Sequence, residues 1–227
     1  MDAFGLPVNK VEIKTFGTTK ALVIERFDRV WTKESVLMRV PQEDFCQALS
    51  IPPSRKYQNN DRSGNEKQPS MVEVLNVLKG SDRPAEDQKA FLKAQIIFWL
   101  IGATDGHAKN FSIFLGVGGR FQLTPLYDVL TVQPYADELL LRRKEMKMAM
   151  SVGDNNHYRI DEIQGRHFEQ TAKRAGLPDY IAREALEEVS SSAEKAIQSL
   201  EERLPSDFPE EIHASVVRAL KSRLKSV

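Results

Sequence analysis

The stretch that decides the fold is residues 101–115, which read IGATDGHAKNFSIFL. Within six positions it carries four polar side chains able to do chemistry, namely Asp105, His107, Lys109 and Asn110. An apolar, helix-like run precedes them at residues 96–100, and an apolar, strand-like run follows at 111–115. These flanks predict that the polar loop is held at the edge of the core, where its side chains need hydrogen-bond partners or a ligand.

A tight hairpin is predicted directly after this loop. Segments 111–116 and 120–126 flank Val117-Gly118-Gly119, a glycine-rich turn signature. If the hairpin centres on Gly118, its pairing carries Asp128 back to a place opposite residue 108. Side-chain oxygens of Asp105, Asn110 and Asp128 would then converge, and oxygen ligands of this kind suit Mg²⁺.

The order of loop, hairpin and returning carboxylate is that of protein kinases and favours phosphoryl transfer. In that interpretation Asp128 and Asn110 hold Mg²⁺ on the nucleotide phosphates. Asp105 orients the attacking hydroxyl and accepts its proton, while His107 and Lys109 neutralise charge. A structural alternative stays open for each part, since Asp-Gly and Lys-Asn are common in turns and Asp128 could cap a helix.

The rest of the chain predicts an α+β protein that is mainly helical, with a small N-terminal β-element. Strands are predicted at residues 8–16, 20–28 and 36–40. The second of these begins with the apolar run 21–24, which is typical of a buried strand. Residues 52–69 are polar and are predicted to form a mobile loop. Helices are predicted to begin at Pro41 and to span residues 71–79, 84–100, 166–175, 179–204 and 210–224.

Composition indicates an ordinary globular protein. The chain has 227 residues, 41% of them hydrophobic, and its 32 basic and 32 acidic residues cancel. A neutral balance gives no reason to expect a large nucleic-acid footprint. The single cysteine, Cys46, is expected to be a small buried side chain. The start lacks the pattern of a signal peptide, and no apolar run approaches the ~20 residues that span a bilayer, so a cytoplasmic location without membrane contact is expected.

Four segments resemble the signature of HipA-type toxin kinases, and they are residues 25–29, 41–44, 98–112 and 123–129. This resemblance implies a protein-kinase-like or HipA-like C-terminal lobe that uses ATP and Mg²⁺ to phosphorylate serine or threonine. It also implies the toxin of a two-gene toxin–antitoxin pair, whose target is an aminoacyl-tRNA synthetase, typically the glutamyl enzyme, so that translation is inhibited. The implied partner is a HipB-like helix-turn-helix antitoxin, and DNA is contacted only through it.

The resemblance also assigns roles by position. Asp105 matches the family's catalytic base, and Asn110 and Asp128 match its metal ligands. The matched ATP contacts are Glu25, Arg26, Phe27, Gln42, His107, Ala108, Lys109, Asn110, Tyr127 and Asp128.

The same resemblance divides the chain into two parts. Residues 1–40 are expected to be a remnant of the kinase N-lobe with its hinge strands, and residues 41–227 to be the helical C-lobe. The family's Gly-rich phosphate loop, strand lysine and phosphorylated serine loop have no counterpart here, so an incomplete N-lobe is expected. An exposed apolar face is then expected along Val11, Ile13 and residues 21–24.

Two other functions stay open. The chain could be an inactive remnant that only binds an antitoxin or a kinase partner. It could also be another Mg²⁺-dependent phosphotransfer or phosphohydrolase protein, although the length of the resemblance disfavours this.

Overall fold

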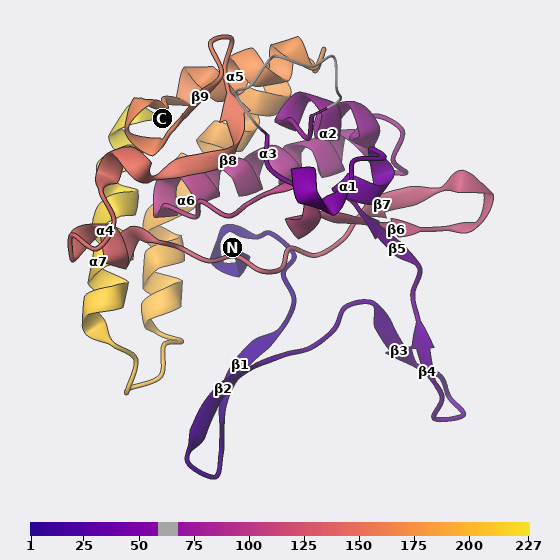
Figure 1. Ribbon diagram of the computed structural model, residues 1–227, viewed down its shortest axis with the longest axis horizontal. Coiled ribbons are helices and arrows are strands. Elements are labelled where there is room, and N and C mark those ends of the chain that lie inside the picture. The colour runs from indigo at the N-terminus through magenta and orange to yellow at the C-terminus, as the bar shows by residue number, and fades with distance from the viewer. Residues whose placement is uncertain (59–67) are drawn as a thin grey trace.

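The computed structural model describes residues 1–58 and 68–227. Of the predicted loop at 52–69, residues 59–67 lie outside the described part. The body of the molecule is helical, and short sheets lie at its edge and beyond it (Figure 1). The helices are α1 (Phe45–Ala48), α2 (Met71–Leu78), α3 (Pro84–Ile101), α4 (Gln133–Asp137), α5 (Gly165–Arg174), α6 (Asp179–Glu201) and α7 (Glu210–Arg223). The predicted α+β, mainly helical fold is confirmed.

Helix α3 is the centre of the core. It starts with Pro84 in its first turn, where proline costs no hydrogen bond, and ends at Gly102 with φ 73°. Its residues 96–100 are all apolar and buried, and Trp99 also donates its indole N–H to the carbonyl of Ile160 at 3.0 Å. Each large side chain buried in this way contributes about 1.5–3 kcal/mol. The end of α3 is therefore a rigid base for the loop that follows it.

A three-stranded antiparallel sheet continues from that loop, in the order β5 (Gln42–Asp44), β6 (Ser112–Leu115) and β7 (Phe121–Leu123). The predicted helix start at Pro41 is wrong, because residues 42–44 pair with β6 instead. Helix α1 begins only afterwards, where the Asp44 carboxylate accepts a hydrogen bond from the backbone N–H of Gln47 at 3.0 Å.

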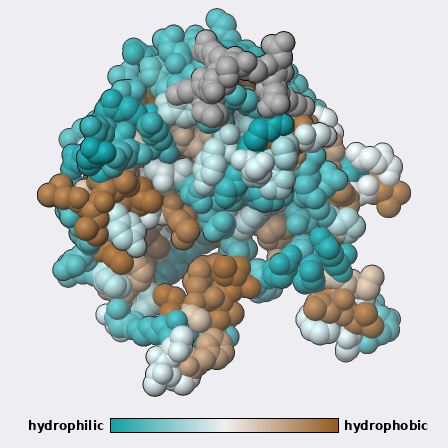
Figure 2. All heavy atoms as spheres, in the orientation of Figure 1, coloured by the Kyte–Doolittle hydropathy of each residue, from teal (hydrophilic) through white to brown (hydrophobic). Residues whose placement is uncertain are grey.

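Two further hairpins come before this sheet in the chain and project away from the body (Figure 1). They are β1 (Val11–Phe16) with β2 (Thr19–Ile24), and β3 (Arg29–Trp31) with β4 (Leu37–Arg39). The prediction that the run at 21–24 is a buried strand is wrong, since Leu22 is 57% exposed. The expected exposed apolar face is confirmed at Val11, Ile13, Leu22 and Ile24, and Figure 2 shows apolar side chains on both hairpins.

The C-terminal half matches its predicted helices at α5, α6 and α7 to within a few residues. It also contains a hairpin that the sequence did not predict, β8 (Lys147–Val152) with β9 (His157–Arg159). Cys46 is buried, as expected. Among residues 1–58 and 68–227, no helix is both long and apolar enough to cross a membrane.

Candidate active site

The polar loop after α3 is fixed by its own backbone and by one glycine. The N–H of Ala103 bonds to the carbonyl of Phe98 at 2.8 Å, and the N–H of His107 bonds to that of Asp105 at 2.8 Å. Gly106 lies against the ring of Phe98, where an added Cβ would come within 2.4 Å of a ring carbon. Only glycine lets the loop turn this tightly over the core.

Asn110 joins the loop to the returning strand. Its Nδ2 donates to the backbone carbonyl of Asp105 at 2.9 Å and to that of Asp128 at 3.5 Å. The hairpin register explains this meeting, because Ile113 pairs with Leu123 as a centre at Gly118 requires. The prediction that Asp128 returns beside the loop is therefore confirmed as geometry.

Asp128 itself has an exposed side chain and a backbone φ of 56°. Few residues other than glycine adopt this left-handed conformation, although aspartate tolerates it better than most. Strained backbone of this kind is commoner at functional sites than elsewhere. With the Nδ2 of Asn110 committed to backbone oxygens, the Oδ1 of Asn110 and the Asp128 carboxylate are the oxygens that could ligate a cation.

Tyr127 stabilises the same junction between the loop and the returning strand. Its hydroxyl donates to the carbonyl of Lys109 at 2.7 Å and lies 2.6 Å from the hydroxyl of Ser112. Burial raises the pKa of Tyr127 to about 12. The ring also packs against Phe27, with centroids 5.4 Å apart, and Phe27 in turn meets Phe114 edge-on. The segment after β2 is thereby tied to the loop.

Tyr57 contacts both Asp105 and His107. Tyr57 donates its hydroxyl hydrogen to Oδ1 of Asp105, and its ring meets the His107 ring edge-on at 4.9 Å. The side chain of Asp105 is 45% exposed, whereas that of His107 is only 5% exposed, with Nε2 4.0 Å from the same carboxylate oxygen. Asp105 is thus the more accessible of the two side chains.

The predicted charge of His107 needs correction. Burial is the main cause that lowers its pKa, and the nearby Lys56 ammonium lowers it further. His107 is therefore neutral at pH 7 and can act there as a hydrogen-bonding group but not as a cation.

The ammonium of Lys109 also differs from the expectation. It pairs with Asp44 at 2.6 Å, so it ties the loop to β5 and α1. Ala108, next to it, is fully buried and contributes packing and its backbone.

The matched ATP contacts at residues 25–27 and 42 do not all lie at the loop. Phe27 reaches the site by ring packing, whereas Arg26 forms an ion pair with buried Asp28 at 2.7 Å. Glu25 pairs with Lys10 at 3.4 Å and lines a separate cavity of about 1480 Å³ beside β1, β2, α6 and α7. Gln42, on β5 opposite Phe114, keeps a buried Oε1 with no partner among the described residues.

The donor set fits a magnesium nucleotide. Mg²⁺ takes one or two protein oxygens and completes its shell with phosphates and water, so Asn110 and Asp128 are sufficient. Among the described residues, no group of three or more His, Cys, Asp or Glu side chains could hold a metal alone. The unpartnered Oε1 of Gln42 and Nδ1 of His107 are the kind of buried polar atoms that a ligand would satisfy.

Sequence reasoning missed three contributors to this site. Tyr57 and Lys56 gave no signal, because they stand in a polar stretch without periodicity. Asp44 was interpreted as an acid in a first helical turn, although a carboxylate three residues before Gln47 also fits a capping box.

The fold and this loop–hairpin arrangement define the class of the protein, a kinase-like C-terminal lobe. Residues 1–197 match the family model described as the HipA-like C-terminal domain, and the chain belongs to that family. It is 35% identical over 202 residues to Y4mE of Sinorhizobium fredii, whose name gives it only as a candidate kinase, covering 88% of this chain and 44% of that protein. It is 32% identical over 157 residues to the serine/threonine-protein kinase toxin HipA of Shewanella oneidensis, covering 66% of this chain and 34% of that one.

Solved structures agree with this family. The Shewanella oneidensis HipA, in a complex with HipB and operator DNA, superposes with a TM-score of 0.81 at 26% identity, covering 99% of this chain and 52% of HipA. The Helicobacter pylori proinflammatory kinase CtkA has a TM-score of 0.63 at 16% identity, covering 100% of this chain and 79% of that one, which is a likeness of fold. The chain spans about half or less of the length of the HipA-type relatives.

Proposed function

We propose that this chain is the catalytic lobe of an ATP- and Mg²⁺-dependent protein kinase that phosphorylates serine or threonine. The observation that carries the proposal is that the side-chain amide of Asn110 joins the backbone carbonyls of Asp105 and Asp128, so that the two aspartates stand at one junction. Phosphoryl transfer demands positioning and charge stabilisation more than covalent chemistry by the protein. A proton acceptor and a cation site held by one rigid loop and hairpin supply those two needs.

Each residue then has a physical role. Asp105, which is exposed, orients the substrate hydroxyl and accepts its proton as the oxygen bonds to the γ-phosphorus and the bond to ADP breaks. Asn110 and Asp128 would hold Mg²⁺, which neutralises phosphate charge when bound. Neutral His107 donates an N–H near the transferred group, and Gln42 offers its unpartnered oxygen to the nucleotide. Phe27 and Tyr127 form the packed wall between the β2 end and the loop.

The division into residues 1–40 and 41–227 belongs to the same proposal. The apolar faces of the β1–β2 and β3–β4 hairpins are suited to packing against the other half of a kinase N-lobe. Supporting this, the chain spans about half of the Shewanella HipA to which it is structurally similar.

A toxin role is proposed from the relatives. One of them is a serine/threonine-protein kinase toxin, and its structure is a complex with HipB and operator DNA. We therefore propose a HipB-like helix-turn-helix antitoxin as partner, with DNA contacted through it. An aminoacyl-tRNA synthetase is the proposed target, whose phosphorylation would inhibit translation.

A second function is favoured by one observation. Lys109, expected at the phosphates, is held by Asp44. A chain that used this loop only structurally would be a binding module for an antitoxin or kinase partner.

An assay of the transfer of labelled γ-phosphoryl groups from ATP to protein distinguishes a kinase from a binding module. We expect slow transfer by the 227-residue chain, reduced at least ~100-fold by Asp105→Asn, since general-base catalysis contributes that much. Transfer that persists unchanged in Asp105→Asn would contradict the kinase proposal. No transfer at all, together with no nucleotide binding, would favour the binding module.

A further inference from the structure

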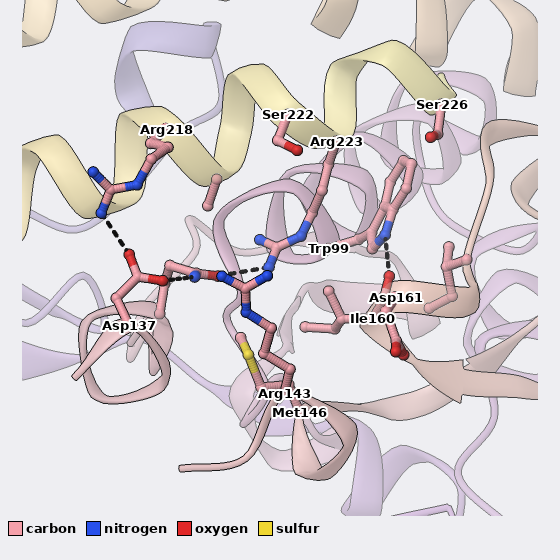
Figure 3. A pocket seen from close by; sticks show the side chains of 13 residues that line it. Trp99, Asp137, Arg143, Met146, Ile160, Asp161, Arg218, Ser222, Arg223 and Ser226 are labelled. Atoms are coloured by element: carbon pink, nitrogen blue, oxygen red, sulfur yellow. Dashed lines mark hydrogen bonds and ion pairs between the residues drawn. The ribbon is translucent and has the colours of Figure 1, made fainter. Parts of the chain in front are cut away.

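A second cavity, of about 420 Å³, lies beside α7, and no residue of the loop 103–110 lines it (Figure 3). Its walls come from α7 and the residues after it, from α4, from the segment before β8, from residues 160–163 after β9 and from Trp99 of α3. None of the residues assigned to the proposed kinase reaction lines it. Its function, if it has one, is therefore separate from phosphoryl transfer at Asp105.

The acidic side chains of this cavity are already neutralised. The Asp137 carboxylate is paired with Arg218 at 2.8 Å, and hydrogen bonds from Ser215 and Gln133 also reach it. Although burial raises the pKa of Asp137, these donors hold it below its ordinary value. Asp161 is paired in the same way with Arg159, at 2.6 Å.

Two arginines of the cavity, Arg143 and Arg223, form no ion pair with a carboxylate among the described residues. Figure 3 shows their guanidinium groups pointing toward each other across the cavity. Within the described part of the chain, Arg223 donates only to neutral oxygens, the carbonyl of Leu100 at 2.8 Å and Oε1 of Gln133 at 2.5 Å. Burial and then the proximity of Arg143 lower the pKa of Arg223 to about 10, against a smaller opposing effect of Asp137, so Arg223 is still charged at pH 7.

A structural role explains why Arg223 is in the cavity, but no such role explains Arg143. By bonding to Leu100, Arg223 satisfies a carbonyl at the C-terminal end of α3, where a cation is stabilising. Nothing of this kind holds Arg143, which is exposed and whose guanidinium group forms no hydrogen bond or ion pair with any described residue. Placing a second guanidinium beside a partly buried one costs free energy unless an anion offsets it.

We propose that this cavity binds a phosphoryl group, held between Arg143 and Arg223. Guanidinium groups bind phosphate oxygens in a planar, two-pronged geometry. Ser222 and Ser226 also line the cavity and can donate hydroxyl hydrogens. A metal cation would be repelled by the two arginines, and an apolar ligand would leave them unpaired. The volume exceeds that of inorganic phosphate, so the group can belong to a small phosphate monoester.

Trp99 provides a local reporter for the test. The chain has two tryptophans, and the other, Trp31, is 68% exposed on the β3–β4 hairpin. In a Trp31→Phe background, Trp99 fluorescence is titrated with inorganic phosphate and, separately, with glycerol phosphate. Ionic strength is held constant with chloride, because unspecific charge effects depend on salt.

A saturable change that Arg143→Gln weakens about tenfold is expected, since one charge-assisted hydrogen bond is worth about 1.5–3 kcal/mol. Lys144→Gln is the matched control: it removes the same charge from the neighbouring exposed residue, which does not line the cavity. This control should stay within about twofold of the parent. Far-ultraviolet circular dichroism verifies that both variants are folded.

The two ligands distinguish the sources of the phosphoryl group. Tighter binding of glycerol phosphate supports a monoester as occupant, and equal binding supports free phosphate. No saturable change with either ligand would overturn the proposal. Equal weakening by Arg143→Gln and Lys144→Gln would also overturn it, because the binding would then be unspecific attraction of anions.

Discussion

The hydroxyl of Tyr57 donates a hydrogen bond to Oδ1 of Asp105, the side chain proposed as catalytic base. Burial and this bond to Asp105 raise the pKa of Tyr57 to about 12, so the hydroxyl keeps its proton at every physiological pH. A substrate hydroxyl must therefore share or displace Tyr57 to reach that oxygen. The contact links a residue from a polar segment, which carried no sequence signal, to the centre of the proposed chemistry.

A double-mutant cycle with Tyr57→Phe and Asp105→Ala, which removes the acceptor oxygen, measures this contact. We expect the effects of the two single substitutions on the free energy of unfolding to differ from additivity by roughly 1 kcal/mol. This coupling energy is small for a hydrogen bond to a charged group, because both side chains are about half exposed. Urea unfolding of the four proteins gives the coupling. Additive effects would mean that the hydroxyl does not hold Asp105 in solution.

The stability of the chain should fall in mild acid partly because of His107. Its pKa is lowered in the folded state, so below about pH 6.5 the unfolded chain binds more protons than the folded one. The unfolding free energy therefore decreases as the pH falls from 7 through 6.5 toward the folded pKa. His107→Gln should flatten this decrease, as measured by urea midpoints between pH 7.5 and about 5. A slope identical to that of the parent would contradict the burial of a neutral His107.

Gly106→Ala should destabilise the chain by about 1–3 kcal/mol, because the added Cβ overlaps the ring of Phe98. Phe98→Leu makes room, so the double variant should lose clearly less than the sum of the two single changes. Thermal unfolding of the three variants provides the comparison. If the costs add, the clash is not the reason for glycine at this position.

Asp44 combines two contacts that can be separated. Asp44→Ala removes both the cap of α1 and the ion pair with Lys109, and a lost cap alone costs about 1 kcal/mol. Lys109→Met removes only the ion pair, which is partly exposed to solvent and should cost less than about 1 kcal/mol. Chemical denaturation should therefore rank Asp44→Ala as the more destabilising. The reverse order would show that the cap contributes little and that Lys109→Met is costly because it leaves the Asp44 carboxylate without a cation.

The part of the site that is local in sequence was predictable. A glycine turn at 117–119 fixes the pairing of β6 with β7, and this register alone brings Asp128 back to Asn110. The apolar run before Asp105 likewise predicts that the loop begins at the edge of the core. Both inferences depend on short-range geometry, which one sequence carries.

Contacts between distant segments were not predictable. Gln42 lies in a strand because β6, far along the chain, supplies its partner, although the local pattern favoured a helix. Leu22 and its apolar neighbours satisfied the pattern of a buried strand, yet Leu22 stays 57% exposed, since only an open cavity lies between that hairpin face and α6 and α7. Tyr57 reaches Asp105 across 48 positions and follows no periodicity.

The most direct test of the proposed kinase site is thermal unfolding with and without Mg²⁺–ATP. A ligand at ~100 times its dissociation constant adds about 2.7 kcal/mol, which for a chain of this size raises the midpoint by roughly 5–10 °C. We predict such a rise only when Mg²⁺ and ATP are both present. Asp128→Asn should abolish it, and Asp154→Asn, which changes an exposed carboxylate on the β8–β9 turn, should leave it intact. The absence of any rise in the parent, or an undiminished rise in Asp128→Asn, would contradict the account.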